Sequence, residues 1–284
     1  MSALRKDLHE QNRLSWNEAT KAHNSHKRDQ AKFLREGGST VYAEELDLLG
    51  DLRGKSLCHL QCNSGQDTLS LARLGATVTG VDISDEAISF AERLSADSGI
   101  GGRFVRADVY DFLEQAPEGS FDLVFCSYGA IAWLSDIHLW GRGVARILRE
   151  GGAFVAVDAH PFMMVLGEDK LDLKYQYSGG EAVFDPGVND YVAAAGEALT
   201  PSGWQEGVSN FKNPHPDVAF QWGMGELITA LIEPGLRLDR FVEYPFTVWR
   251  AFTIQERRPD KRFYLPSTLP QIPQMFGVRA SKPG

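Results

Sequence analysis

The 284-residue sequence has little cysteine, no excess of positive charge and no long apolar run. Its three cysteines, Cys58, Cys62 and Cys126, fall in or beside expected buried strands, which indicates reduced thiols and a cytoplasmic protein. The formal net charge of −9 argues against a nucleic-acid partner, because that affinity depends on cationic contacts to phosphate. No apolar run approaches the roughly 18–20 residues of a membrane span, and the polar N-terminal segment has no signal-peptide core. We therefore expect no membrane partner, and either a monomer or a homodimer.

A metal site is also not expected. Cys58, His59 and Cys62 lie close together, but no second pair of cysteines follows that could close a tetrahedral site. We interpret the three residues as part of a buried strand and the loop after it.

The sequence lacks the glycine-rich fingerprint of dinucleotide-binding proteins. Residues 56–82 predict a buried strand, a tight loop, an amphipathic helix and a second buried strand. The loop reads QCNSGQDT and keeps only Gly65, with Gln61 and Asn63 at the other glycine positions. Asp67 then lies in the first helical turn, where it would compete with an anion. The loop favours S-adenosylmethionine (SAM), which carries a sulfonium cation and no phosphate.

An acid follows the second strand. Asp82 is expected at the carboxyl edge of the sheet, where open α/β folds bind ligands, and it could accept both hydroxyls of a ribose. The alternative is an N-cap for the next helix, a role that Ser84 can fill.

Strands and helices alternate through the middle of the chain, which predicts a parallel sheet with right-handed crossovers. An N-terminal helix is expected over 4–24, and a second helix, capped by Ser39, runs to Leu49. We expect strands at 56–60, 77–81, 103–106, 121–126, 152–158, 236–244 and 275–282, and further helices at 66–74, 85–97, 136–148 and 226–232.

Several motifs together resemble the class I SAM-dependent methyltransferases that act on small molecules. These motifs are CHLQCNSGQDT to GVDIS, RADVYD, FDLVFCSYGAIAWL and RILREGGAFVAVDAHPF. The resemblance covers residues 50–160 well and 224–284 more loosely. It implies an α/β fold with a doubly wound, mostly parallel, seven-stranded Rossmann-like sheet and a C-terminal antiparallel hairpin. The single globular domain would comprise a helical cap (1–50), the SAM-binding core (51–160), an aromatic-rich insertion that covers the substrate (161–223) and the rest of the sheet (224–284).

The same resemblance implies a set of cofactor-binding residues. They are Tyr42, Gln61, Asn63, Gly65, Asp82, Ile83, Asp108, Val109 and Ser127. Asp108 would read the adenine amino group, although it could instead cap the helix that begins at Val109. Tyr42 would reach the methionine carboxylate, and the cap residues Trp16, His23 and His26 would close over SAM. The chain departs from the family at His59, where the first strand commonly carries an acid.

The insertion is rich in aromatic residues that could clamp a substrate or surround a sulfonium. They are Tyr175, Tyr177, Phe184, Tyr191, Trp204, Phe211, Phe220 and Trp222. Each one taken singly is better explained as the insertion's own core, but one or two of the group are expected to touch substrate. His215 in the same insertion is better explained as part of a solvated turn.

Methyl transfer asks little of side chains, because correct orientation of the reactants alone lowers a barrier by roughly 7–11 kcal/mol. Tyr128 and His160 follow the fourth and fifth strands, so both are candidate catalytic residues. His160 is the better base by its intrinsic pKa, and a structural histidine in the turn before Pro161 is an equal alternative. Tyr128 could also be only a wall of the site.

The sequence therefore predicts a SAM-dependent enzyme that methylates a small metabolite at nitrogen, oxygen or carbon by in-line displacement and releases S-adenosylhomocysteine. One alternative is a SAM-binding protein without turnover. A nucleic-acid methyltransferase is less favoured because of the acidic charge, and because CSYGA stands where amino-directed DNA enzymes carry [DN]PP[YF]. An NAD(P)-dependent oxidoreductase is opposed by the loop sequence.

Overall fold

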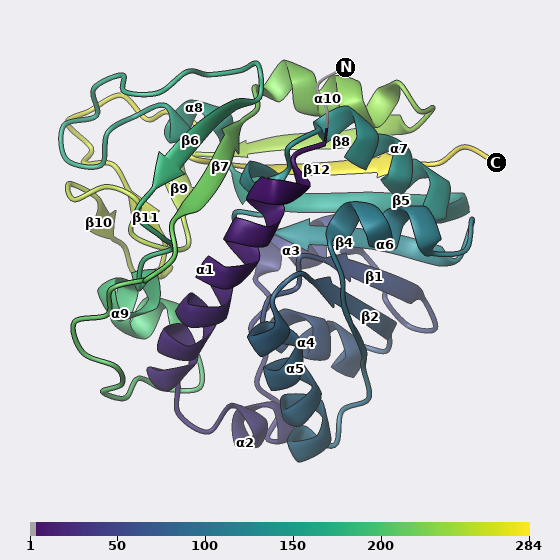
Figure 1. Cartoon of the computed structure of the whole chain (residues 1–284), viewed down its shortest axis with the longest axis horizontal. Helices are drawn as coiled ribbons and strands as arrows, with labels where there is room; N and C mark the ends of the chain where they lie inside the picture. Colours follow the sequence, from purple (N-terminus) through teal and green to yellow (C-terminus); the bar gives the residue numbers. More distant parts are fainter. Residues whose placement is uncertain (1–3) are drawn as a thin grey trace.

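Seven strands form the central sheet of the computed structural model, which describes residues 4–284 (Figure 1). The strand order is β3-β2-β1-β4-β5-β12-β8, in which β1 to β5 are parallel and β12 is antiparallel to both of its neighbours. The strands are β1 (Ser56–Leu60), β2 (Thr77–Asp82), β3 (Arg103–Arg106), β4 (Phe121–Ser127), β5 (Leu148–Ala159), β8 (Arg237–Tyr244) and β12 (Met275–Ser281). The expected fold class, including the C-terminal antiparallel pair, is confirmed.

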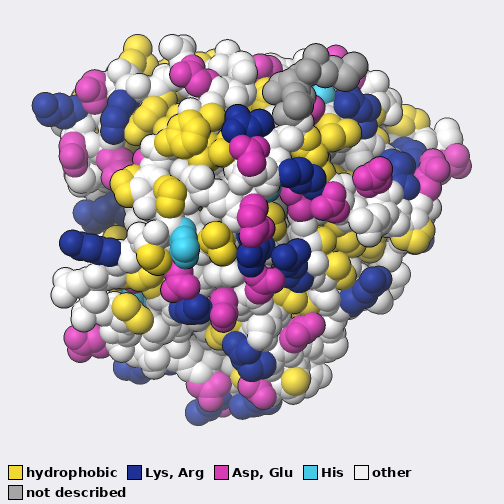
Figure 2. All heavy atoms as spheres, in the orientation of Figure 1, with side chains coloured by type: hydrophobic (Ala, Val, Ile, Leu, Met, Phe, Trp, Pro, Cys, Tyr) yellow, Lys and Arg dark blue, Asp and Glu magenta, His cyan; other side chains and the backbone are white. Residues whose placement is uncertain are grey.

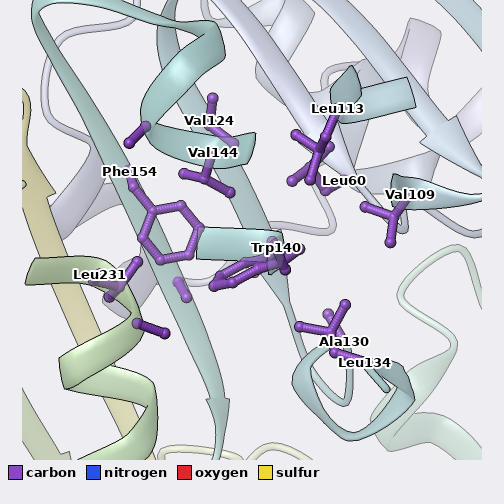
Figure 3. Packing of buried hydrophobic residues seen from close by; sticks show 14 of the residues in the cluster. Leu60, Val109, Leu113, Val124, Ala130, Leu134, Trp140, Val144, Phe154 and Leu231 are labelled. Atoms are coloured by element: carbon purple, nitrogen blue, oxygen red, sulfur yellow. The ribbon is translucent and has the colours of Figure 1, made fainter. Parts of the chain in front are cut away.

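Helices cover both faces of the sheet. They are α3 (Ala43–Leu49), α4 (Gln66–Arg73), α5 (Asp85–Ser98), α6 (Val109–Gln115), α7 (Ile137–Ile147) and α10 (Met224–Ile232), with a 3₁₀ turn η1 (Ile131–Trp133) after β4. Alternate residues of β4 point to opposite faces, so that Val124 packs in one apolar cluster and Phe125 in the other. The first cluster centres on Trp140 of α7, whose ring meets Phe154 of β5 edge to face at 5.2 Å (Figure 3).

The N-terminal segment differs from expectation after its first helix. Helix α1 (Lys6–Ser25) is followed by a short helix α2 (Gln30–Arg35) that the sequence did not predict. Helix α3 begins only at Ala43, so the expectation that Ser39 caps it is wrong. The Ser39 hydroxyl instead accepts a hydrogen bond from the Val41 amide, which is a local turn.

The insertion contains a short antiparallel pair of strands. Strands β6 (Glu181–Asp185) and β7 (Asp217–Gln221) pair with each other, and short helices α8 (Pro161–Met164), α9 (Tyr191–Ala195) and η2 (Gly196–Leu199) complete it. A second small sheet of β9 (Phe246–Thr247), β10 (Glu256–Arg257) and β11 (Phe263–Tyr264) was not predicted. Its strands of two residues carry too little pattern to be recognised.

Helix α1 and the insertion form one cover, although they lie far apart in the sequence (Figure 1). The Asn12 side chain donates to the Val218 carbonyl at 2.9 Å and accepts from the Val218 amide at 2.7 Å, so it pairs α1 with β7. The Ser15 hydroxyl accepts from the Val188 amide at 3.0 Å. Helix α1 also bonds to Ser84 and Asp108 through Asn17 and His9, which places the cover over the ends of β2 and β3.

Within residues 4–284, no helix is both long enough and apolar enough to cross a membrane.

Candidate active site

Asp82 ties the end of β2 to the loop after β1. Its two carboxylate oxygens each accept one backbone hydrogen bond at 2.8 Å, from the amides of Asn63 and Ser84. Burial raises the pKa of Asp82 to about 6, while these amides oppose the rise. Ser84 itself caps α5 by accepting from the Ala87 amide, so Asp82 is not needed as a cap. Each Asp82 oxygen therefore keeps lone-pair capacity for a further donor, as two ribose hydroxyls require.

The loop after β1 is held in left-handed backbone conformations. Gln61, Asn63 and Gly65 have φ of 54°, 47° and 75°, although only the last is glycine. A Cβ on Gly65 would lie 2.7 Å from the Ala91 side chain, so this position requires glycine. Non-glycine residues at positive φ are uncommon outside functional sites, where such strain is retained.

Gln61 links this loop to the segment after β4. Its side-chain amide donates to the Ala130 carbonyl at 2.8 Å. Its carbonyl oxygen is buried and has no hydrogen-bond partner among residues 4–284. A buried acceptor without a partner is rare in proteins and fits a site that a ligand with donor groups completes.

Asp108 is held by α1. One oxygen accepts from the Tyr110 amide at 2.9 Å, which caps α6. The other lies 2.7 Å from His9 Nδ1 and 3.1 Å from Lys6 Nζ. The His9 ring also stacks on Tyr110 at 5.3 Å. The alternative role of a helix cap is thus present in the structure, and an adenine contact by Asp108 stays a prediction.

The other expected cofactor residues lie around the same strand ends. Ile83 follows Asp82 and is half-buried, Val109 is buried at the start of α6, and Ser127 ends β4.

Tyr128 stands directly after β4, at the point where the strand order reverses between β1 and β4. Its φ is 45°, and its backbone amide donates to the Val157 carbonyl of β5 at 2.9 Å. Its hydroxyl is buried and has no hydrogen-bond partner in the part of the chain that the structure describes. The buried Asp158 carboxylate fixes the following turn by accepting from the amides of Gly129 and Ile131.

His160 caps α8. Its Nδ1 accepts from the Phe162 amide at 3.0 Å, and its Nε2 lies 3.0 Å from Glu243 Oε1 without hydrogen-bond alignment. Burial lowers the pKa of His160, and Glu243 opposes that shift. With Nδ1 as an acceptor, the ring proton lies on Nε2, which makes His160 a donor toward Glu243 in this conformation. The structural alternative that the sequence left open is therefore realised here.

Tyr42, at the N-terminus of α3, packs against Tyr128 with perpendicular rings 5.7 Å apart. Its neighbour Glu45, which no sequence pattern singled out, is fully buried, and burial raises its pKa well above the usual value. Arg262, likewise not singled out, lies over the Tyr42 ring at 4.6 Å and pairs with Glu44 at 2.7 Å. The segment AEELD reads as an ordinary acidic helix start, so no pattern in it distinguishes the buried acid.

Lys27 and Asp67 were also missed as members of the site. Burial lowers the pKa of Lys27 to about 8, and the charge of Asp67 opposes this shift. The Asp67 carboxylate accepts from the Thr40 hydroxyl, and burial raises its pKa. His59, in contrast, is a core residue, because its Nδ1 lies 2.9 Å from the Thr68 hydroxyl and burial lowers its pKa to about 3.

Aromatic residues of the cap and the insertion meet each other. Trp16 lies 5.5 Å from Trp133 and 6.1 Å from His23, which in turn packs on Tyr191 at 4.2 Å. His26 stacks on Trp204 at 4.8 Å. The other aromatic residues of the insertion do not join this group. Phe220 lies in a small apolar cluster, and the Trp222 indole donates to the Leu134 carbonyl. Tyr177 and Phe184 are exposed, whereas Tyr175, Phe211 and the non-aromatic candidate His215 are half-buried. Tyr191, Trp204, Phe220 and Trp222 thus pack against other parts of the protein, and contact of any of the group with substrate stays a prediction.

The face that carries α1 has interspersed charges. Figure 2 shows Lys and Arg side chains next to Asp and Glu side chains over this face. Pairs such as Arg13 with Asp85 and Lys21 with Glu18 account for part of the pattern. A mixed surface of this kind does not give the basic stripe typical of nucleic-acid binding.

Residues 58–156 match the family model described as a methyltransferase domain. The chain is 33% identical over 119 residues to a fatty-acid O-methyltransferase of Mycolicibacterium smegmatis, which is 39% of each chain. It is 33% identical over 160 residues to a ubiquinone biosynthesis O-methyltransferase of Cupriavidus pinatubonensis, 55% of this chain and 59% of that protein. The chain thus spans about two fifths to three fifths of these relatives.

The fold is similar to that of solved SAM-dependent methyltransferases. One from Mesorhizobium loti superimposes with a TM-score of 0.55 at 20% identity, over 87% of this chain and 100% of that one. The geranyl diphosphate C-methyltransferase of Streptomyces coelicolor A3(2), solved with S-adenosyl-L-homocysteine, superimposes with a TM-score of 0.50 at 14% identity. The match covers 89% of this chain and 78% of that one. At these identities the likeness concerns the fold.

Proposed function

We propose that the chain belongs to the class I SAM-dependent methyltransferases and transfers the methyl group of SAM to a small molecule. The observation that supports this most is the arrangement of Asp82. A half-buried carboxylate at the carboxyl edge of the sheet is held by two loop amides and keeps one accepting position on each oxygen. This donor set fits the ribose of an adenosyl group.

The residues around Asp82 also fit the rest of SAM. The Gln61 side-chain carbonyl oxygen after β1 lacks a donor among residues 4–284. The Asp67 and Lys27 side chains offer opposite charges near the start of α4. When bound, SAM supplies a methyl group on a sulfonium that is already an activated leaving group. The task of the protein is then to orient the acceptor and exclude water, which the cover of α1 and the insertion favours.

Two observations support a small acceptor over a polymer: the names of the relatives, and the cover that α1 and the insertion form. The relatives named above act, by their names, on fatty acids and in ubiquinone biosynthesis. Trp16 and Trp133 meet beside the loop after β4, so little room is left at this point for a folded macromolecule. The acceptor atom is nitrogen, oxygen or carbon.

Tyr128 and His160 are the proposed catalytic residues. Both follow strands that end at the same edge as β1, which supports a position beside the acceptor. The Tyr128 hydroxyl also has no aligned hydrogen-bond partner within residues 4–284. His160 can act as a base only if its ring releases the Phe162 amide or exchanges its Nε2 proton with Glu243.

The central test of the proposal is Asp82→Ala. We expect calorimetry to show S-adenosylhomocysteine binding to the wild type and at least tenfold weaker binding to the variant, because the ribose hydroxyls lose a charged acceptor worth roughly 1.5–3 kcal/mol. Asp97→Ala is the matched control, since Asp97 is an exposed acid on α5. Circular dichroism should verify the fold of each variant. Unchanged affinity in Asp82→Ala would remove the ribose assignment.

A further inference from the structure

Among residues 4–284, two buried oxygen atoms without aligned hydrogen-bond partners lie near each other at the carboxyl end of β4. Glu45 is 0% exposed, and one of its oxygens accepts from the Tyr42 amide at 2.6 Å. The second, Oε1, has no hydrogen-bond partner among residues 4–284, and neither has the Tyr128 hydroxyl. The Tyr128 hydroxyl is near enough to lower the pKa of Glu45 as a donor does, but it is not aligned as a hydrogen bond. A buried carboxylate oxygen without an aligned donor is costly, so Glu45 Oε1 has the capacity to accept a hydrogen bond from a ligand.

The two tyrosines next to this carboxylate belong to a chain of aromatic rings. The Tyr42 and Tyr128 rings are perpendicular at 5.7 Å, and Tyr128 meets Trp249 at 6.2 Å. Rings of this kind attract cations through their π faces. The combination of a carboxylate and aromatic rings is therefore suited to a positively charged group.

The neighbouring charges do not neutralise Glu45. The Arg262 guanidinium lies above the Tyr42 ring and forms its ion pair with Glu44 at 2.7 Å. Asp67 adds a further negative charge that raises the pKa of Glu45. The surroundings of Glu45 are thus acidic on balance, which disfavours a carboxylate or phosphate ligand and favours a cation.

The position of the pair assigns it to the acceptor. Asp82 ends β2, whereas Tyr128 ends β4 on the far side of β1. A nucleoside held at Asp82 leaves the ends of β4 and β5 for the second reactant. Trp249, which touches Tyr128, also packs with Met163 and Phe252 near the end of β5.

We propose that the acceptor is an amine, which donates an N–H bond to Glu45 Oε1 and lies against the rings of Tyr128 and Trp249. This inference rests on the proposed methyl-transfer function. An amine arrives as an ammonium ion at neutral pH and must lose a proton before its nitrogen can attack. In this step one N–H bond breaks, its electron pair stays on nitrogen, and the proton moves to Glu45 Oε1. Burial, which raises the pKa of Glu45, makes the carboxylate a better proton acceptor.

The test compares amines with matched alcohols on the full-length protein loaded with S-adenosylhomocysteine. The probes are 2-phenylethylamine and hexylamine, with 2-phenylethanol and 1-hexanol as their neutral counterparts, measured by calorimetry. We expect the amines to bind at least about tenfold more tightly than the alcohols, because a charge-assisted hydrogen bond is stronger than a neutral one. Glu45→Gln should remove this preference and leave S-adenosylhomocysteine affinity unchanged. Asp47→Asn, which removes an exposed acid from the same helix, should leave the preference intact.

The outcomes separate the two proposals. Wild-type protein that does not bind S-adenosylhomocysteine contradicts the proposed function itself. Wild-type protein that binds it but takes the alcohols as well as the amines, or neither, overturns the amine inference alone. A Glu45→Gln variant with weakened S-adenosylhomocysteine binding also overturns it, because Glu45 then serves the amino group of the cofactor. If Glu45→Gln does not fold, the wild-type comparison still decides, and Tyr128→Phe, which keeps the carboxylate, should keep the amine preference.

Discussion

At the scale of single residues, Asp82 shows how burial sets the pH range of a site. Its folded pKa of about 6 lies above the ordinary value of 3.8 because burial disfavours the carboxylate, and no charged side chain compensates. As pH rises from about 4 to about 6, ionisation of this group lowers the free energy of unfolding, since the unfolded chain gives up the proton more readily. A ligand whose hydroxyls donate to the carboxylate favours the ionised form.

The raised pKa of Asp82 gives a prediction for the pH dependence of cofactor binding. S-adenosylhomocysteine affinity should be constant above about pH 7 and should fall about tenfold per pH unit below about pH 6, because protonated Asp82 accepts fewer hydrogen bonds. Calorimetry across this range measures the profile. Asp82→Asn should bind weakly and without the inflection. An inflection of equal size in Asp82→Asn would assign the titration to another group.

His160 gives a second prediction at this scale. His160→Ala should lower the free energy of unfolding by about 1 kcal/mol, because the Phe162 amide loses its cap acceptor. Asn is a good N-cap residue, so His160→Asn should recover most of that loss. Urea denaturation monitored by circular dichroism measures both variants. Equal losses in the two variants would contradict the capping role.

At the scale of elements, the cover depends on pairing between α1 and β7. Asn12→Ala leaves the amide and carbonyl of Val218 without partners in a buried position, so it should cost about 2 kcal/mol or more of stability. Hydrogen exchange should become faster in α1 and in β6–β7 together, and not in β1 or β4. Gln11→Ala, at the neighbouring half-buried carboxamide, is the control. Faster exchange confined to α1 would show that the two parts of the cover open separately.

The elements also show what the sequence could predict. Strands β1 to β4 are short apolar runs bounded by polar turns, so their positions follow from local pattern. The start of α3 and the β9–β11 sheet depend instead on distant partners, such as Arg262 with Glu44. In the site, the positions of Asp82 and Tyr128 also follow from local pattern, because both residues stand at the ends of predicted strands. The partners of Asp108 come from α1, about a hundred residues away, and the burial of Glu45 is set by tertiary packing.

At the scale of the whole molecule, the N-terminal helix, the insertion and the sheet share buried contacts. His9 links α1 to the end of β3 through Asp108, Asn12 links it to β7, and Trp222 of the insertion donates to the Leu134 carbonyl beside η1. Such cross-contacts couple the stability of the parts.

We therefore expect a single unfolding transition. Three of the six tryptophans, Trp16, Trp204 and Trp222, belong to the cover, so tryptophan fluorescence gives the cover more weight than circular dichroism at 222 nm, which reports on all helices. The two thermal curves should coincide, and S-adenosylhomocysteine should shift both upward by the same amount. A fluorescence transition at lower temperature than the circular dichroism transition would show that the cover melts on its own.

The engagement of Asp108 by His9 and Lys6 has a kinetic consequence. A nucleoside that uses this acid must displace side chains of the protein's own first helix, so its apparent affinity is reduced by the fraction of molecules in which the acid is released. The same competition acts on the spent nucleoside after transfer, because the returning imidazole and ammonium occupy its place. If Asp108 binds the nucleoside as predicted, His9 and Lys6 would compete with the product for one carboxylate and weaken its binding.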